Sequence, residues 1–341
     1  MKITYLVGNG LDLSLGLKTA YKDFYNYQME LYKPENGESN IIYDEIKKDK
    51  NNNFENWSDF ELDLGKLTKD KPNIVDTEEQ RNKFIEDFIQ AIKDLKIYLS
   101  EVEKEYESRE GFNTWSIALQ DTLRLLVKDE DLPRKNKLKL EKYFNSFPNI
   151  SDEVRILTFN YTRIFSKLLK KSTSQFYIPY RQSNQIVTDP IHAHGTLEKN
   201  IIMGVNDSTQ ISERFSSDEC SDLIKKDLLE DSREDMLNIN SSIINESDLI
   251  VIYGMSIGET DKLLWNIVGE VSVNKNLPII IYHYTNDIDK AIIREQKRLI
   301  RDLVDVFISK SGIAEENKTI LMDNLHIILG TADGVFKLLK G

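Results

Sequence analysis

Short apolar runs, each followed by a glycine-bearing or polar turn and then by a helical pattern, leave few folds open to this chain. Runs of this kind are typical of strands that are buried on both faces of a parallel sheet. Their alternation with helices predicts the α/β class, with a doubly wound and mostly parallel sheet. The predicted strands are Ile3–Val7, Arg155–Phe159, Leu249–Tyr253, Pro278–Tyr284 and, more weakly, Leu325–Leu329.

The segment 31–150 breaks this alternation. It is rich in charge, and apolar residues recur at helical spacing from Glu78 to Tyr106. Further helices are predicted over Thr114–Val127 and Lys135–Phe147, with prolines and a glycine between them. We therefore predict a helical insertion subdomain at 31–150.

The α/β pattern resumes after the insertion. Residues 1–30 and 151–341 are accordingly predicted to form one nucleotide-binding domain. A long helical stretch over Ile211–Asn245 is predicted to lead into the strand at Leu249–Tyr253.

Composition excludes several classes of protein. The chain has 341 residues, 40% of them hydrophobic and 30% charged, and no apolar run is long enough to cross a bilayer. The N-terminal apolar stretch is too short for a signal peptide, so we expect a cytoplasmic protein with no membrane partner. A single cysteine, Cys220, excludes an intramolecular disulfide and a zinc ribbon. The net charge of −12 opposes nucleic-acid binding but still allows a small phosphorylated ligand on backbone N–H groups.

A glycine-rich turn after the first predicted strand contains Gly8, Asn9, Gly10, Asp12 and Gly16. Glycines at such a turn let the backbone approach a ligand closely, and the start of the next helix offers N–H groups to a phosphate. The spacing differs from the G-x-G-x-x-G fingerprint of dehydrogenases. An ordinary tight turn with Asp12 as a helix cap explains the same residues, so both interpretations stay open.

Asn160 follows the second predicted strand, within TFNYT. Ligands of open α/β sheets bind outside the carboxyl ends of the strands, so this side chain is expected to face the site. Its amide both donates and accepts, which suits holding a ribose hydroxyl or positioning a water molecule. The competing interpretation is a cap for the helix that begins near Arg163.

His192 and His194 lie two residues apart in HAHG, which ends in Gly195. In an extended segment both face the same side, and imidazole titrates near neutrality, so either is a candidate proton acceptor. A metal pair would need a third ligand, which no nearby motif supplies convincingly. A purely structural histidine is the remaining alternative, and it suits His192 better than His194.

Gly254 and Ser256 follow the third predicted strand, where a glycine and a hydroxyl again stand at a strand's carboxyl end. Each of these four motifs is weak alone. Because three of them follow buried strands, we expect all four to converge on one crevice.

The order of the motifs GNGLD, TFNYT, HAHG and GMSIGETD resembles the AbiH family of abortive-infection proteins, which defend bacteria against bacteriophage. WSDFE in the predicted insertion is also similar to that family. The resemblance covers essentially the whole chain. More distantly, the same motifs resemble the sirtuin-like NAD-binding fold, in which Gly8, Gly10 and Gly16 fall on the glycine loop, and Gly254 and Ser256 fall near the adenosine half of the ligand.

The sirtuin-like resemblance also implies catalytic roles. Asn160 falls on the asparagine that orients the nicotinamide ribose, and His194 falls on the catalytic histidine. Departures from the sirtuin pattern at Asn9, Lys18 and Thr162 leave open a nucleotide other than NAD. The zinc-binding cysteines of the deacetylases are absent from the sequence, which favours NAD hydrolysis over deacetylation.

We therefore expect an effector that hydrolyses the nicotinamide glycosidic bond of NAD or a related dinucleotide, with no added cofactor and no metal. Asn160 and His194 would be its catalytic residues, and Asp12 would face a ribose hydroxyl or the nicotinamide end. Such an activity must be gated, so an unidentified phage-derived trigger is expected. The amphipathic stripe of Glu78–Tyr106 is a candidate surface for trigger binding or homo-oligomerisation, although packing on the sheet accounts better for most of its residues.

Two other classes of function stay open. One is a non-catalytic module that senses a nucleotide and signals to a partner. The other is a metal-dependent nuclease toxin, which the negative charge opposes. Its ligands would come from His192, His194, Asp12, Asp59, Glu61 and Asp261.

Overall fold

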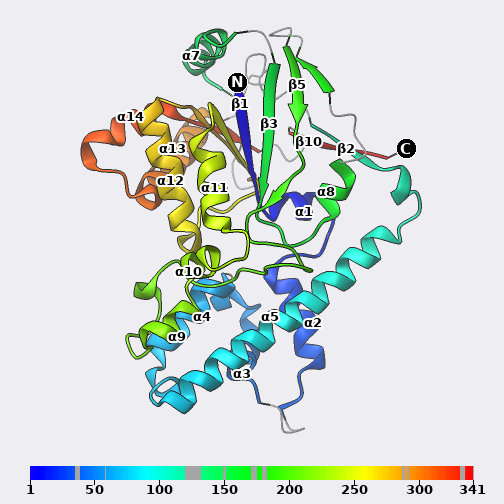
Figure 1. Ribbon diagram of the computed structural model, residues 1–341, viewed down its shortest axis with the longest axis vertical. Coiled ribbons are helices and arrows are strands. Elements are labelled where there is room, and N and C mark those ends of the chain that lie inside the picture. The colour runs from blue at the N-terminus through cyan, green and yellow to red at the C-terminus, as the bar shows by residue number, and fades with distance from the viewer. Residues whose placement is uncertain are drawn as a thin grey trace.

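The computed structural model describes residues 1–34, 39–57, 59–119, 132–148, 151–169, 175–178, 183–285, 289, 292–330 and 335–340 (Figure 1). At its centre lies an eight-stranded sheet with the order β4-β5-β3-β1-β7-β8-β9, and β6 pairs with β3 beside this row. Among the described strands of this sheet, only β4 and β5 pair in antiparallel fashion. The strands are β1 (Lys2–Val7), β3 (Ser151–Thr158), β4 (Gln175–Ile178), β5 (Ser183–Val187), β6 (Ile191–His192), β7 (Leu249–Tyr253), β8 (Ile279–His283) and β9 (Leu325–Leu329).

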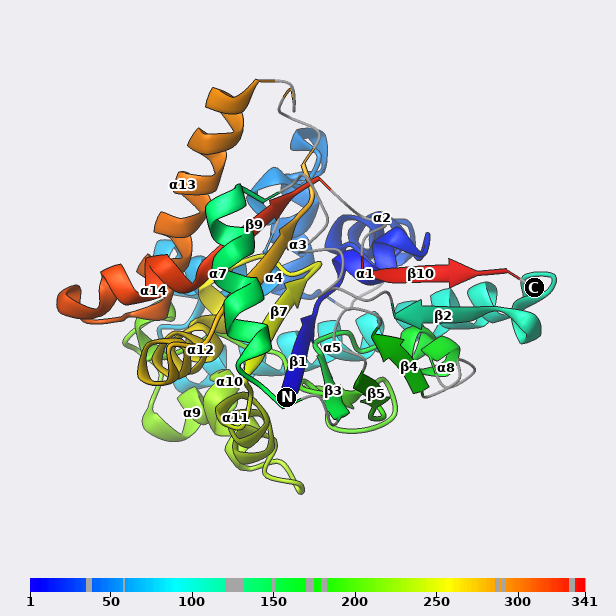
Figure 2. The same cartoon turned by 90° about the horizontal axis from the view of Figure 1, so that it is seen from above.

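Both faces of the sheet are covered (Figure 2). One face packs against helices α11 to α14, and the other against α1, α8 and the antiparallel pair of β2 and β10. The predicted α/β class with a doubly wound, mostly parallel sheet is confirmed. The covering elements are α11 (Met236–Asn245), α12 (Lys262–Lys275), α13 (Ile293–Ser311), α14 (Lys318–Asn324), α1 (Gly10–Ser14), α8 (Ile164–Leu169), β2 (Ser116–Leu119) and β10 (Phe336–Leu339).

The direction of winding reverses at β1. The chain places β3, β5 and β4 on one side of β1, and then returns to place β7, β8 and β9 on the other. The crevice between the carboxyl ends of β1 and β7 is therefore the topological switch point, where open α/β sheets bind their ligands.

A group of helices, which we call the helical lobe, lies beyond the carboxyl ends of the strands (Figure 1). The side chain of Thr77 accepts from the N–H of Gln80, and the side chain of Gln80 accepts from the N–H of Thr77. This capping box begins the longest helix of the lobe, and the helix predicted from Glu78 to Tyr106 is confirmed. The lobe contains α2 (Tyr21–Leu31), α3 (Ile41–Lys48), α4 (Phe60–Asp70) and α5 (Glu78–Glu107).

The helix predicted over Thr114–Val127 is wrong in the part that the structure describes. Ser116–Leu119 is the strand β2, and residues 120–127 lie outside the described residues. Ile117 and Leu119 are buried while their neighbours are half-buried, so burial alternates with the period of a strand. The partner strand β10 comes from the far end of the chain, so no local pattern indicated the pairing.

The helical stretch predicted over Ile211–Asn245 is interrupted, and this correction bears on the site. It divides into α9 (Ser217–Ser221), α10 (Lys225–Glu230) and α11. Asp235 has a φ of 46° and caps the start of α11, so the chain turns there instead of continuing as a helix.

The helix predicted over Lys135–Phe147 is confirmed as α7 (Arg134–Asn145). It lies at the amino end of the sheet, where Tyr143 Oη donates to the backbone oxygen of Asp248 at 2.7 Å (Figure 1). One hydrophobic core runs from β1 into the helical lobe without a break. The division into 1–30 with 151–341 and 31–150 stays a prediction.

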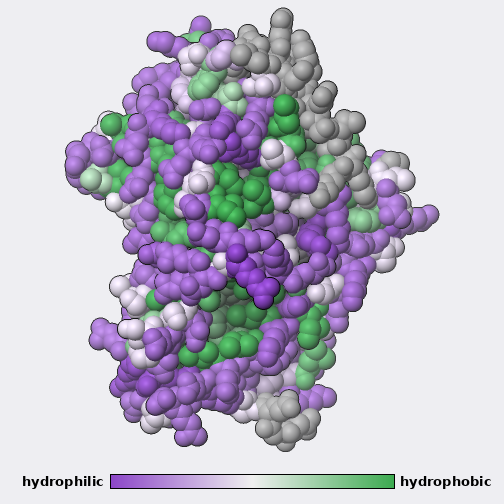
Figure 3. All heavy atoms as spheres, in the orientation of Figure 1, coloured by the Kyte–Doolittle hydropathy of each residue, from purple (hydrophilic) through white to green (hydrophobic). Residues whose placement is uncertain are grey.

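The outer surface is mostly hydrophilic, with an apolar area over α11 on the face shown in Figure 3. None of the described helices combines the length and the apolar character that crossing a bilayer requires.

A substitution at Phe88 of α5 tests whether the helical lobe and the sheet share one core. Its ring is buried 6.1 Å from the ring of Phe60 in α4. Phe88→Ala is expected to lower the free energy of unfolding by about 3–5 kcal/mol, because it leaves a cavity in a core shared by lobe and sheet. In urea unfolding, fluorescence and circular dichroism should shift together. Ile89→Ala, at the exposed neighbouring position, should change stability by less than about 0.5 kcal/mol. A lobe that unfolds separately from the sheet would contradict the shared core.

Candidate functional site

A cleft lies at the switch point, between the rim of the sheet and the helical lobe. Its volume is about 530 Å³, and we call it the acidic cleft because three carboxyl side chains line it against one lysine. The turns after β1, β3 and β7 form one wall, and Ala20, Tyr21 and the start of α4 form the other. The lining residues are Gly8, Asn9, Ala20, Tyr21, Asp59, Glu61, Phe159, Tyr161, His194, Lys225, Gly254, Met255, Ser256, Ile257, Gly258, Thr260 and Asp261.

Three glycines hold the turns after β1 and β7 against each other. A Cβ on Gly8 would lie 2.7 Å from the backbone oxygen of Gly254, and a Cβ on Gly10 would lie 2.6 Å from the Cα of Gly254. Gly254 has a φ of +64°, which favours glycine. The N–H of Gly8 donates to the oxygen of Tyr253 at 3.0 Å, and that of Gly10 to the oxygen of Gly254 at 2.8 Å. Both N–H groups are therefore paired within the protein, and the three glycines allow the two turns to pack closely. Binding of a phosphate by the start of the next helix stays a prediction.

A buried ion network forms the floor of the acidic cleft. The ammonium of Lys225, from α10, lies 2.9 Å from Glu61 Oε2 and 2.9 Å from Asp261 Oδ1. Glu61 belongs to α4, and Asp261 to the turn η7 (Glu259–Asp261) after β7. Glu61 also accepts a hydrogen bond from the N–H of Gly204 at 2.8 Å. The network therefore joins the helical lobe to the rim of the sheet.

The pKa values of the two carboxyl groups of the network shift in opposite directions. Burial raises the pKa of Glu61, and attraction to Lys225 offsets only part of that rise. Burial also opposes the ionised form of Asp261, but Lys225 and then His194 hold the pKa of that carboxyl below its usual value. Burial opposes the charge on Lys225 too, yet attraction to both carboxylates raises its pKa. Glu61 is thus the member of the network that takes up a proton most readily.

His194 stands at the back of the acidic cleft beside this network. Its Nε2 lies 3.9 Å from Asp261 Oδ1, and its ring meets the ring of Phe159 edge-to-face at 5.0 Å. Burial, with a further contribution from Lys225, lowers the pKa of His194 to about 3, so the imidazole is neutral at neutral pH. Gly195 follows with a φ of +79°, and a Cβ there would lie 1.8 Å from the oxygen of Asn200, so this turn requires glycine.

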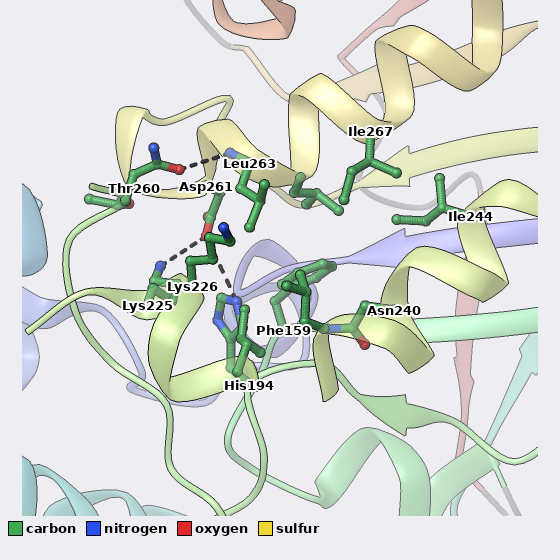
Figure 4. A pocket seen from close by; sticks show the side chains of 14 residues that line it. Phe159, His194, Lys225, Lys226, Asn240, Ile244, Thr260, Asp261, Leu263 and Ile267 are labelled. Carbon is green, nitrogen blue, oxygen red and sulfur yellow. Dashed lines mark hydrogen bonds and ion pairs between the residues drawn. The ribbon is translucent and has the colours of Figure 1, made fainter. Parts of the chain in front are cut away.

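A smaller pocket lies beside His194, and its volume is about 40 Å³ (Figure 4). Ile244, Leu263 and Ile267 form part of its apolar wall. His194 and Asp261 line both this pocket and the acidic cleft. The imidazole therefore separates the polar acidic cleft from this small apolar pocket.

Asn160 is buried on the α1 side of the rim and is not among the residues that line the acidic cleft. It is 5% exposed, and neither atom of its amide makes a hydrogen bond of good geometry in the described part of the chain, although the amide lies close enough to Asp12 to affect the pKa of that carboxyl. Nearby Asp12, which is 1% exposed, accepts a hydrogen bond from the hydroxyl of Thr162. Burial raises the pKa of Asp12 to about 7, against smaller lowering effects of Thr162 and Asn160.

The structure does not join the predicted catalytic pair directly. His194 contacts the acidic cleft, whereas the amide of Asn160 faces Asp12. His192 lies between them in sequence but has different neighbours: its Nδ1 donates to the backbone oxygen of Asn160 at 2.9 Å, and its Nε2 lies 3.0 Å from Ser166 Oγ. The two histidines therefore do not face a common partner, and His192 fixes the backbone of Asn160.

The remaining predicted residues divide between the acidic cleft and its supports. Asn9 and Ser256 are exposed and line the cleft. The amide of Asn9 donates to the Thr19 oxygen at 3.0 Å and accepts from the Thr19 hydroxyl at 2.6 Å. Gly16 lies outside the cleft, where its φ of +82° turns the chain after α1 and its oxygen accepts from Arg109 Nη2 at 3.4 Å.

Sequence reasoning missed Lys225 and gave Glu61 and Asp261 only as ligands in the metal-dependent alternative. Nothing in the sequence distinguishes the buried Lys225 from its exposed neighbour Lys226. Among the residues that the structure describes, no group of three or more His, Cys, Asp or Glu side chains is arranged to hold a metal ion. Between Glu61 and Asp261 stands the ammonium of Lys225.

The two adjacent lysines provide a matched test of the network. Lys225→Ala should lower the free energy of unfolding by about 3–5 kcal/mol, because it leaves the buried carboxyl of Glu61 and the half-buried carboxyl of Asp261 without their cation. Lys226→Ala removes only an exposed pair with Glu230 at 3.7 Å and should cost less than about 1 kcal/mol. Urea unfolding of both variants decides the point. Equal stability of the two variants would contradict a structural role for the network.

The pKa of Asp12 predicts a pH dependence of stability. Its folded value of about 7 lies above the ordinary value of 3.8, so between these limits the folded chain binds more protons than the unfolded chain. Asp12 therefore makes its full contribution to stability below pH 3.8. This contribution decreases as the pH rises above 3.8 and is lost once the pH has passed about 7. Relative to Asp12→Asn, the wild type should lose up to about 1.4 kcal/mol per pH unit within the window, measured by urea unfolding. Parallel curves for the two proteins would contradict the raised pKa.

Comparison with known proteins gives the family. No curated protein matches the chain. The family model for bacteriophage abortive infection AbiH matches residues 4–283, which include every residue that lines the acidic cleft. The chain belongs to the AbiH family of bacteriophage abortive-infection proteins.

Proposed function

We propose that this AbiH protein acts in abortive infection by hydrolysing the nicotinamide glycosidic bond of NAD, or of a related dinucleotide, in the acidic cleft. The observation that carries the proposal is a neutral histidine buried at the back of a cleft at the switch point of a doubly wound sheet. Ligands of such sheets, dinucleotides among them, bind at this point. The family supplies the role in phage defence, and the reaction is inferred from the site.

The charge of the acidic cleft suits a cationic substrate end. Among its described lining residues, Asp59, Glu61 and Asp261 are acidic, and Lys225 is the single lysine or arginine. The nicotinamide of NAD is cationic, and its ribosyl carbon gains oxocarbenium character as the bond breaks. Carboxylates near that carbon stabilise the transition state, and they repel phosphate. The pyrophosphate would therefore lie outside the acidic cleft, towards Gly254.

The reaction makes a small demand on its base. Nicotinamide leaves as a neutral molecule without being protonated. Water then adds to the ribosyl carbon, and one proton is released with ADP-ribose. His194 is neutral and could accept this proton late, after the carbon has become cationic, so a weak base is sufficient. Asp261, 3.9 Å from Nε2, would stabilise the imidazolium.

Asn160 would act from the other side of the rim. A buried amide without partners costs about 1–3 kcal/mol, which a hydrogen-bonded ligand would recover. A ribose hydroxyl or a water molecule that enters between Asn160 and the cleft would supply both a donor and an acceptor. In this proposal Asn160 orients the ribose and the attacking water.

Hydrolysis of NAD without control would kill the host, so the activity must be gated. Tyr21, Asp59 and Glu61 of the lobe region form part of the cleft wall. A phage-derived trigger or homo-oligomerisation that moved the lobe would therefore act directly on the site.

Substitution of the two proposed catalytic residues tests the reaction. His194→Ala and Asn160→Ala should each lower nicotinamide release from NAD by about a hundredfold or more, the usual loss with a positioned acid–base group. Release is measured with purified protein and in phage-infected cells, because a gated enzyme is silent without its trigger. His326→Asn, on β9 and outside the acidic cleft, is the matched control and should keep full activity. Full activity in both catalytic variants would falsify the assignment.

The same assay separates the other two classes of function. A metal-dependent nuclease would lose activity with EDTA and would cleave nucleic acid without releasing nicotinamide. A sensing module would bind NAD without turnover, in infected as well as uninfected cells. Either result would replace the proposed reaction.

A further inference from the structure

A second cleft lies across the glycine junction from the acidic cleft. Its volume is about 460 Å³, and we call it the tyrosine cleft because Tyr253, Tyr282 and Tyr284 line it. Leu13 and Ser14 of α1 form its opposite wall. The two clefts share Gly254 and Met255, so they are the two sides of one ridge at the switch point.

The tyrosine cleft differs from its neighbour in charge. Its described lining residues include no Asp, Glu, Lys or Arg, and burial lowers the pKa of its one histidine, His283. The cleft therefore favours an uncharged, flat, apolar group over the cationic group that the acidic cleft favours.

The aromatic residues of the tyrosine cleft combine a fixed floor with an exposed mouth. The rings of Tyr253 and Tyr282 lie 6.1 Å apart, and Phe336 packs 5.4 Å behind Tyr253. At the mouth, Tyr284 is 62% exposed and Leu13 is 45% exposed. A flat aromatic ligand would remove these apolar surfaces from water and stack on a tyrosine ring.

We infer that the tyrosine cleft binds the adenine base of the dinucleotide whose nicotinamide end enters the acidic cleft. This inference rests on the proposed function, because it assumes a ligand with two ends that lies over Gly254 and Met255. The charges of the two clefts fix its direction: the cationic ring goes to the carboxylates and the neutral purine to the tyrosines. Gly254 then separates the two halves of the ligand.

Calorimetric binding of AMP and of nicotinamide mononucleotide tests the two clefts separately. The wild type should bind AMP, and Tyr284→Ala and Leu13→Ala should each weaken that binding, by about tenfold for loss of the stacking ring. Affinity for nicotinamide mononucleotide should not change in either variant. Tyr284→Phe keeps the ring and should bind AMP as the wild type does. Ile97→Ala, at an exposed position on α5, controls for loss of surface apolar area. Thermal denaturation checks that every variant is folded.

Nicotinamide release from the same samples keeps the two proposals distinguishable. If Tyr284→Ala raises the KM for NAD and leaves kcat unchanged, the adenine assignment is supported. AMP that fails to bind the wild type, or that binds Tyr284→Ala equally well, would overturn it even if NAD is cleaved. AMP binding that depends on Tyr284, in a protein that releases no nicotinamide under any condition, would support the adenine cleft and contradict the hydrolase.

Discussion

One buried ammonium, shared by two carboxyl groups from different parts of the fold, sets the geometry and the electrostatics of this site. Removing an ion from water costs several kcal/mol, so Lys225 can be buried only while Glu61 and Asp261 stay within contact distance. That condition fixes α4 of the helical lobe against the turn after β7, and with it the width of the acidic cleft. Burial is the main reason why the pKa of His194 is low, and the same ammonium lowers it further, so the packing of the lobe contributes to the protonation state of the candidate base.

A second constraint is the contact of three glycines at the switch point. Gly8, Gly10 and Gly254 bring the turns after β1 and β7 so close that no side chain fits between them. Space for a ligand remains only on the two sides of this junction, and the two clefts occur there. Glycines in such a turn suggest a phosphate cradle, but here the N–H groups of Gly8 and Gly10 are already paired within the protein. Their effect on a ligand is indirect, because they divide the crevice.

The sequence predicted what depends on local pattern. Apolar runs gave the bounds of β7 and β9, and helical spacing gave α5, because burial on one or both faces determines which residues stand there. Residues that pair over long distances were not predictable. The strand β2 owes its conformation to β10, and Lys225 owes its importance to a glutamate on another helix. At the site, the motifs located the crevice and His194, but not which side of the rim the amide of Asn160 faces. That depends on the buried carboxyl of Asp12, whose surroundings come from a different part of the chain.

The distribution of neutral and charged groups at this rim suits a substrate that carries a positive charge. Burial favours the neutral forms of His194 and Asp12, on the two sides of the rim, whereas Lys225 stays charged between Glu61 and Asp261. A protonated histidine would repel a nicotinamide cation at close range, so a depressed pKa removes a barrier to binding. It also weakens the base, which would be a serious loss for a reaction that begins with proton abstraction. In the proposed reaction the bond breaks because its leaving group is already cationic, so His194 would act as a base only after the difficult step, and its low pKa would cost little.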